Sequence, residues 1–310
     1  MQIFFLMSSF LLGIKYKNIS VKKTFILKRW EKISCTYYPF LIISLIIMCF
    51  LGVPLSVETV LSHFLYLNYF VQERIEGVSF GHLWYISMQM LCYAFVFLLG
   101  RRSMICFIRK LRMKHFLFLL IFFYVLLFFI VNRTSIPSRI FIVLFSYYVI
   151  FVRADEICNF VNHVNDFVEN RMEMWKRKGL NFLFLFCFFL LNFLTLYLFC
   201  CNNLNEKILL RDSLIFITSV SWFFVFLLFC RNKRNGIFVS FVSGISFDLY
   251  LVHHPFILGN YSLIKSDVFL NNIYANGVIT VIGVVLLAYF LNVLSHNIRT
   301  YIEEAKFLQC

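Results

Sequence analysis

Charged residues are scarce in this 310-residue chain. Asp, Glu, Lys and Arg together make up 14% of the sequence, whereas hydrophobic residues make up 61% and aromatic residues 20%. A soluble domain cannot hide that much apolar surface in its interior. No stretch is long and polar enough for a separate soluble domain, so the sequence predicts a single membrane-embedded domain over residues 1–310.

Several chemical signatures are also missing. The ten cysteines are scattered, with no C-x-x-C pair and no metal-ligand spacing, so we expect no metal site and no bound cofactor. None of the seven histidines begins an H-x-x-x-x-D motif. The formal net charge of +14 comes from Lys and Arg in short loops rather than from a separate basic surface, so nucleic acid is not an expected partner.

Apolar runs recur along the whole chain and predict an all-α, polytopic membrane bundle of about nine transmembrane helices. Residues 116–131 and 137–152 are separated only by NRTSI, so these two runs form either a tight helical hairpin or a pair of partly re-entrant pieces. The nine runs cover residues 2–14, 37–53, 82–100, 116–131, 137–152, 180–201, 213–230, 237–258 and 275–294.

The Lys and Arg residues predict the orientation of these helices. If loops alternate between the two sides, 23 of the 29 Lys and Arg residues fall on one side, which the positive-inside rule assigns to the cytoplasm. The C-terminus and the loops at 15–36, 100–115, 153–179 and 231–236 are then cytoplasmic, and the N-terminus and 54–81 are outside. The basic loop 15–36 suits either the anionic headgroups of membrane lipids or a phosphate-bearing ligand.

Polar side chains line up on two of the predicted helices. His82, Tyr85, Gln89 and Tyr93 share one stripe, and a second stripe holds Ser243, Ser246, Tyr250, His253 and His254. Both histidine sites lean toward the outer side. Such stripes either line a site between helices or only bond neighbouring helices to one another. Asp248 points away from the second stripe and is expected to be structural, either buried against another helix or protonated.

Three stretches together resemble the acyltransferase-3 family of bacterial integral-membrane O-acyltransferases. IFFLMSSFLLGIKY followed by FILKRWEKI is similar to the family's second helix and the R-x-x-R motif after it. GHLWYIS resembles the family's H-x-W motif, and GISFDLYLVHHPFIL resembles its late S-x-x-Y-L-x-H-x-P segment. The order and spacing of the three stretches agree with the family from residue 2 to about residue 294.

The resemblance implies transfer of an acyl group, usually acetyl, from acyl-CoA to a hydroxyl of a cell-surface or lipid-linked glycan. It implies a multi-pass protein of the bacterial cytoplasmic (inner) membrane. His253 and His82 are the expected catalytic residues. Lys32 replaces the second Arg of R-x-x-R, which removes a two-pronged phosphate donor. The expected substrate-binding residues are Arg29, Lys32, Trp84, Ser246, Tyr250 and His254.

The family's first helix, which carries an Arg and a His, has no counterpart in this sequence. We therefore expect a chain that is N-terminally truncated relative to the family and weakly active or inactive as written. A transporter or a glycan-handling polymerase or flippase would also need polar stripes among helices, and it is the competing class. The sequence leaves the acceptor, the acyl chain and the oligomeric state open.

Overall fold

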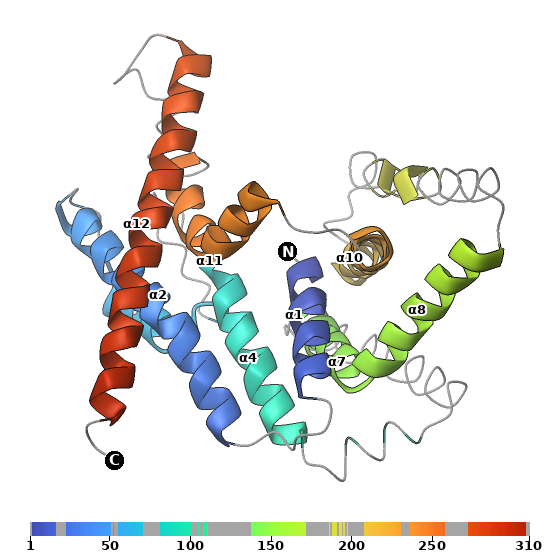
Figure 1. The fold of residues 1–310 in the computed structure, drawn as a ribbon. Coiled ribbons are helices and arrows are strands. Elements are labelled where there is room, and N and C mark those ends of the chain that lie inside the picture. Colours follow the sequence, from blue (N-terminus) through green and yellow to red (C-terminus); the bar gives the residue numbers. More distant parts are fainter. Residues whose placement is uncertain are drawn as a thin grey trace. The chain divides into compact units, whose positions relative to one another are not determined.

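The computed structural model of the protein is built of helices, and no strand occurs in the part of the chain that it describes (Figure 1). The helices are α1 (Gln2–Lys15), α2 (Lys23–Phe50), α3 (Val57–Phe64), α4 (Trp84–Leu99), α7 (Ser138–Val152), α8 (Ala154–Arg171), α10 (Ile208–Cys230), α11 (Ile237–Ile257) and α12 (Ile273–Phe307), and a 3-10 turn, η1 (Gly81–Leu83), precedes α4. The described residues are 2–16, 23–50, 52, 55–70, 81–100, 105, 108, 110, 138–171, 186, 188–190, 192–193, 195, 197, 208–230, 236–257 and 272–307.

The chain forms two compact units, each assembled from segments far apart in the sequence. The first unit takes in residues Met1–Lys22 and Leu91–Lys233, and the second takes in residues Lys23–Met90 and Arg234–Cys310. The boundary between them falls inside α4, whose first residues belong to the second unit.

The first unit packs α1 against α7, α8 and α10. Its buried core contains an edge-to-face ring pair, Phe10 and Phe223, with centroids 5.6 Å apart. Gly13 lets α1 approach the end of α7, because a Cβ at this position would lie 2.6 Å from Ala154 Cβ and closer still to the Phe151 carbonyl oxygen. Small residues are what allow such close crossings in membrane bundles.

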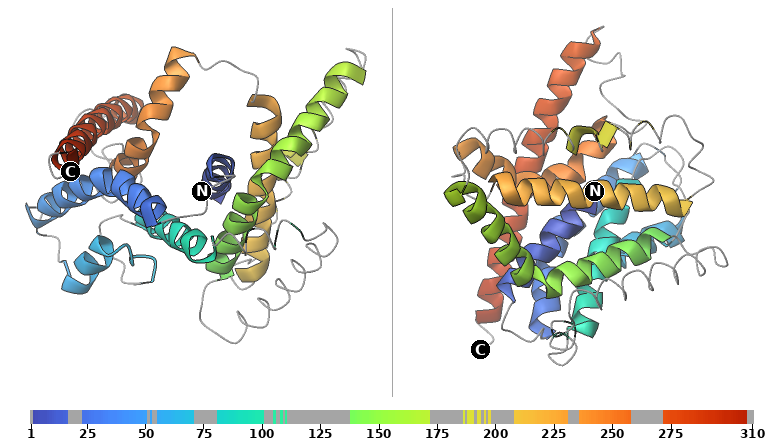
Figure 2. Two further views of the ribbon diagram at one scale, coloured as in Figure 1. Left: turned by 60° about the horizontal axis from the view of Figure 1, so that its bottom comes forward. Right: turned by 90° about the vertical axis from the view of Figure 1, so that its right-hand side faces the viewer.

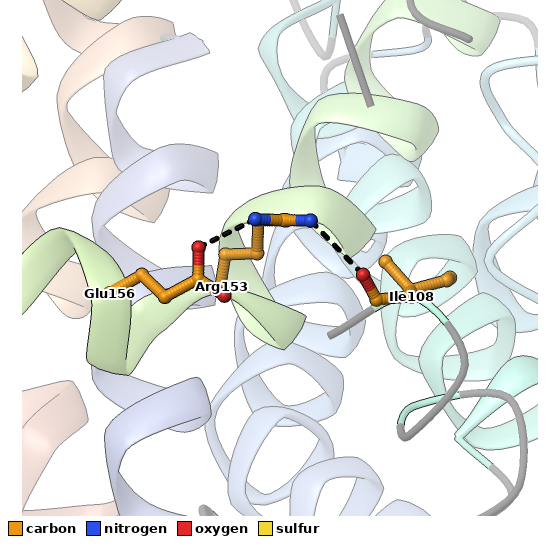
Figure 3. A network of polar contacts seen from close by, with 3 residues as sticks. All are labelled: Ile108, Arg153 and Glu156. Atoms are coloured by element: carbon orange, nitrogen blue, oxygen red, sulfur yellow. Dashed lines mark hydrogen bonds and ion pairs between the residues drawn. The ribbon is translucent and has the colours of Figure 1, made fainter. Parts of the chain in front are cut away.

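The bend between α7 and α8 is held by a buried arginine. Figure 2 shows the chain changing direction between these two helices. Arg153 donates from one guanidinium nitrogen to Glu156 at 2.5 Å and from the other to the Ile108 carbonyl at 3.0 Å (Figure 3). A buried charge is tolerated when it is paired and hydrogen-bonded in this way.

The second unit packs α12 along both α11 and α2. Asp248 of α11 accepts a 2.8 Å hydrogen bond from the Asn292 amide of α12, and its side chain is 2% exposed. The predicted burial of Asp248 against another helix is therefore confirmed. On the other side of the unit, α3 and the turn after it lie against the middle of α2 through Ser34, Tyr37 and Tyr38.

Within the described part of the chain, three helices are long and apolar enough to cross a membrane, namely Thr24–Phe50, Arg211–Leu228 and Tyr274–Glu304. Shorter apolar helices occur at Gln2–Lys15, Trp84–Leu99 and Ile140–Val152. The chain is thus an all-α membrane protein, as predicted. The predicted run 116–131 and most of 180–201 lie outside the described residues, and the described residues of the other seven runs are helical except Gly52 and Gly100.

Three helical segments differ from the prediction. Residues 23–36 were expected in a loop but form the first turns of α2, because Lys and Arg are good helix formers and their long side chains can reach away from an apolar helix. α3 and α8 fall in the expected loops 54–81 and 153–179. Neither carries a long apolar run, so hydropathy alone did not predict them as helices.

Candidate active site

Three histidines of the second unit come together where η1 meets the end of α11. The His82 and His254 rings stack with centroids 4.6 Å apart and planes inclined by 12°. The His82 ring also lies 5.8 Å from the ring of His253. The structure thus joins the two polar stripes that the sequence placed on separate helices, and we call this group the histidine cluster.

Pro255 explains how His82 is attached to α11. In an α-helix the N–H of residue 255 would bond the carbonyl of residue 251, but proline has no N–H to give. The Leu251 carbonyl instead accepts a 3.1 Å hydrogen bond from His82 Nε2. Because a carbonyl can only accept, Nε2 of His82 carries the proton in this arrangement.

A second hydrogen bond runs the opposite way between the same elements. The Tyr250 hydroxyl donates to the His82 carbonyl, and its ring lies 5.4 Å from the ring of His82. Tyr85, one helical turn after His82, packs its ring 5.2 Å from the ring of Tyr250. His82 is 2% exposed, so these contacts clamp η1 to α11 and fix the position of the buried imidazole.

His253 is held differently, because its hydrogen bonds stay within its own helix. Nδ1 lies 2.8 Å from the Tyr250 carbonyl and 3.1 Å from the Leu249 carbonyl, so Nδ1 carries the proton. The neutral ring then has its lone pair on Nε2. Among the described residues no hydrogen bond uses this nitrogen, and the side chain is partly exposed. His253 is thus poised to accept a proton from a molecule beside the cluster.

The other predicted site residues lie around the cluster rather than in it. Ser246 is exposed, and its hydroxyl donates to the Ser243 carbonyl at 3.0 Å. The Trp84 ring lies 5.8 Å from the ring of Tyr69 and 6.4 Å from the ring of its neighbour Tyr85. Their predicted roles in substrate binding remain predictions.

The two basic residues lie on the first part of α2. Arg29 holds its guanidinium 5.9 Å from the ring of Phe25, and Lys32 is exposed one turn further along. Eight residues separate Arg29 from Tyr37, which is a rise of about 12 Å along the helix. α2 in turn packs against α11, the helix that carries Tyr250, His253 and His254. The basic residues and the histidine cluster are therefore connected through one helix.

The family model described as Acyltransferase domain (Acyl_transf_3) matches residues 1–294. This chain belongs to the acyltransferase-3 family. It is therefore a membrane acyltransferase, as the three quoted stretches indicated. No curated protein and no solved structure matches the sequence.

The family's two histidine motifs make direct contact in this structure. The proline of VHHPF leaves the Leu251 carbonyl without its helical N–H partner, and the His of GHLW supplies the donor that bonds this carbonyl. Sequence reasoning placed Tyr85 in the stripe of His82 but did not count it among the site residues. It did not name Asn292, which carries no signal in a single sequence.

A G-x-S-x-G stretch, Gly77 to Gly81, immediately precedes His82. In hydrolases this motif works as a nucleophile elbow, on a sharp turn between a strand and a helix. Residues 77–80 lie outside the described part of the chain, and no strand occurs in the part that is described. The described residues also bring together no group of three or more His, Cys, Asp or Glu side chains that could hold a metal ion. The described side chains that meet at this site are imidazoles and phenols.

Proposed function

We propose that this membrane acyltransferase transfers an acyl group, acetyl in the simplest case, from acyl-CoA to a hydroxyl of a cell-surface or lipid-linked glycan. The observation that supports the proposal most directly is the state of His253. Its Nδ1 proton is committed to backbone carbonyls, so Nε2 is free to act as a general base. A thioester donor needs no metal for this reaction.

In the proposed step, His253 Nε2 takes the proton of the acceptor hydroxyl while the hydroxyl oxygen attacks the thioester carbonyl carbon. The C–S bond of the resulting tetrahedral intermediate breaks, and the imidazolium returns its proton to the CoA thiolate. The products are an ester of the glycan and free CoA. His82 does not touch the proton in this scheme, because its Nε2–H is bonded to the Leu251 carbonyl. We therefore assign His82 to positioning.

The donor end of the proposed site is on α2. Arg29 and Lys32 are one turn apart and are suited to the phosphates of CoA, since a guanidinium can grip a phosphate with two donors. The phosphates would lie about 12 Å from the level of Tyr37 along α2. The long pantetheine arm of CoA can bridge such a gap and carry the acyl group to the histidine cluster.

The proposed location is the bacterial cytoplasmic (inner) membrane, with the basic start of α2 facing the cytoplasm. Because His82 and His254 are in contact, the start of α4 and the end of α11 lie at a similar depth in the membrane. Alternating loops predict that these two helix ends share a side of the membrane, and they assign both to the outer side. A cytoplasmic acyl donor and an outward-facing acceptor would then meet along α2.

The deciding experiment is acyl transfer by the purified protein in bilayers. With radiolabelled acetyl-CoA and glycan acceptors prepared from bacterial envelopes, we expect label to appear on the glycan, even if at a low rate, and CoA to be released in equal amount. His253→Ala should abolish both signals. A transporter, flippase or polymerase would instead move or join glycans without any dependence on acyl-CoA, and that result would refute the proposal.

Arg29→Ala tests the donor end against its neighbour. We expect this variant to raise the KM for acyl-CoA about tenfold, which corresponds to the loss of a charge-assisted hydrogen bond to phosphate. Lys28→Ala is the matched control, because Lys28 is exposed on the same turn of α2 and lies outside the R-x-x-R positions. Equal effects of both substitutions would indicate that the basic residues bind lipid headgroups.

A further inference from the structure

The short helix α3 has its polarity reversed. Its apolar side chains recur every fourth residue and are exposed, Val57 by 75%, Leu61 by 53% and Leu65 at its C-cap by 63%. Three of its four polar side chains point inward, since Thr59, Ser62 and His63 are each 5% exposed, whereas Glu58 in its first turn is exposed. A helix that faces water shows the opposite pattern. We call Val57, Leu61 and Leu65 the apolar stripe of α3.

The inward side of α3 bonds protein groups. The Tyr37 hydroxyl donates to the His63 carbonyl at 3.1 Å and lies 3.4 Å from His63 Nδ1. The Ser62 hydroxyl donates to the Thr59 carbonyl at 2.7 Å, and the Tyr38 hydroxyl donates to the Phe64 carbonyl at 3.1 Å. A segment within hydrocarbon needs this internal satisfaction, because lipid chains offer no hydrogen-bond partner.

The backbone carbonyls at the end of α3 are also hydrogen-bonded within the protein. The Leu67 N–H donates to the Ser62 carbonyl at 2.7 Å and the Tyr66 N–H to the His63 carbonyl at 3.2 Å, so two of the last carbonyls find backbone partners. Tyr66 takes the left-handed position of this turn, with φ of 58°, which usually belongs to glycine. Its side chain explains the exception, since the hydroxyl lies 2.8 Å from Ser34 Oγ and the ring stacks 5.1 Å from Tyr37.

The position of α3 along α2 is equally informative. The turn after α3 reaches Ser34 and α3 itself reaches Tyr38, which lie 16 and 12 residues before the end of α2 at Phe50. The chain therefore runs back by about 18–24 Å beside a helix long and apolar enough to cross a membrane. Exposed isoleucines cover α2 between Tyr38 and its end, at positions 42, 43, 46 and 47.

We propose that α3 is a re-entrant element that lies in the membrane hydrocarbon, with its apolar stripe against lipid acyl chains, its buried polar side against α2 and Glu58 of its first turn toward the headgroups. The partner of this surface is lipid because α3 is bonded to Tyr37 and Tyr38 of a membrane-spanning helix whose following residues include four exposed isoleucines, where acyl chains are the surrounding solvent. α3 then separates the hydrocarbon from Tyr37 of α2, a helix that packs against α11. This inference does not depend on the reaction that the cluster performs.

Photo-crosslinking in bilayers tests the proposal. Benzoyl-phenylalanine is introduced at Leu61 or Leu65 of the full chain, in nanodiscs whose phospholipids carry alkyne-tagged acyl chains. We expect lipid adducts in yields similar to those at Leu286, an exposed apolar position of the long helix α12. Glu304, exposed near the polar end of α12, is the negative control and should give at least tenfold less adduct. Adducts at the Glu304 level, or adducts to another protein chain, would overturn the proposal.

A measurement on the unmodified chain guards against variants that fail to fold. A membrane-soluble diazirine reagent labels residues that face acyl chains, and mass spectrometry locates the labels. The peptide containing Val57 to Leu65 should be labelled as strongly as the apolar part of α12. Absence of label from this peptide, with α12 labelled, would place α3 outside the hydrocarbon and refute the proposal.

Discussion

In the first unit, the Ser9 hydroxyl donates to the Tyr147 carbonyl and the Trp222 indole donates to Asn192 at 3.0 Å, so these polar side chains serve to join helices. In the second unit, the bonds of Tyr250 and His82 also join elements, but among the described residues the hydrogen bonds of His253 all use its Nδ1. Inside a membrane both patterns are possible for a polar residue. The difference teaches that a left-over atom indicates chemistry when it is basic and its side chain is partly exposed, as with His253 Nε2, whereas the Oδ1 of Asp248 bonds no described residue but is buried.

The largest expected effect sharpens this comparison at His253. Replacing a general base costs about a hundredfold or more in rate, so His253→Ala should lower the acyl-transfer rate by at least that factor. His163→Ala is the matched control, because His163 is exposed on α8 of the first unit. Rates are measured at saturating acyl-CoA and normalised to folded protein. A normal rate for the His253 variant would make the late motif structural, and the contrast between the two units would fail.

In the first unit the largest effect should be on stability. Gly13→Ala would force α1 away from the Phe151 carbonyl and Ala154 Cβ, and overpacking of this kind costs about 1–3 kcal/mol. Gly283→Ala in α12 is the control, because a Cβ there meets nothing within 4 Å. Thermal unfolding in detergent measures both variants. If the two glycine substitutions are equivalent, the close approach of α1 does not stabilise the first unit.

The clamp between η1 and α11 predicts an effect of intermediate size. Pro255→Ala supplies an N–H that competes with His82 for the Leu251 carbonyl, and we expect about a tenfold loss of rate, the equivalent of one hydrogen bond. If Pro255 acts through His82, the double variant Pro255→Ala/His82→Ala should be no slower than His82→Ala alone. Rate losses that simply add would show that the two residues act independently.

The smallest effect is expected at Asp248. Asp248→Asn keeps an oxygen that can accept from the Asn292 amide, so we expect acyl transfer to fall by less than about threefold. Asp248→Ala removes this acceptor and should lower the unfolding temperature as Asn292→Ala does. A rate loss for Asp248→Asn as large as that for His253→Ala would move Asp248 from the structural class into the reaction.

Hydropathy predicted the long membrane helices because burying apolar residues in lipid dominates their energetics. It did not predict that α2 begins at Lys23. A low hydropathy assigns basic residues to loops, although Lys and Arg are good helix formers. It did not predict α3 either. The polar residues of α3 suggest an exposed loop, and only the contacts of α3 with Tyr37 and Tyr38 show that three of the four face inward.

The sequence predicted which residues form the candidate site better than it predicted the contacts between them. Helical spacing placed His82 with Tyr85, and His253 and His254 with Tyr250, on single faces. It did not predict that His254 stacks on His82, or that Ser246 turns to its own helix backbone. Those outcomes depend on how two helices from distant parts of the chain approach each other.

The sequence by itself determined that this protein is helical and membrane-embedded and that it belongs to the acyltransferase-3 family, because composition and local motifs suffice for these conclusions. Only the tertiary structure decided that Nε2 of His82 is committed to another element, whereas the Nδ1 of His253 bonds carbonyls of its own helix. Pro255 has no N–H to donate to the Leu251 carbonyl, and His82, 169 residues away along the chain, donates to this carbonyl instead. A contact over that separation exists only once the helices have packed, and it is what distinguishes a positioning histidine from one that can take a proton.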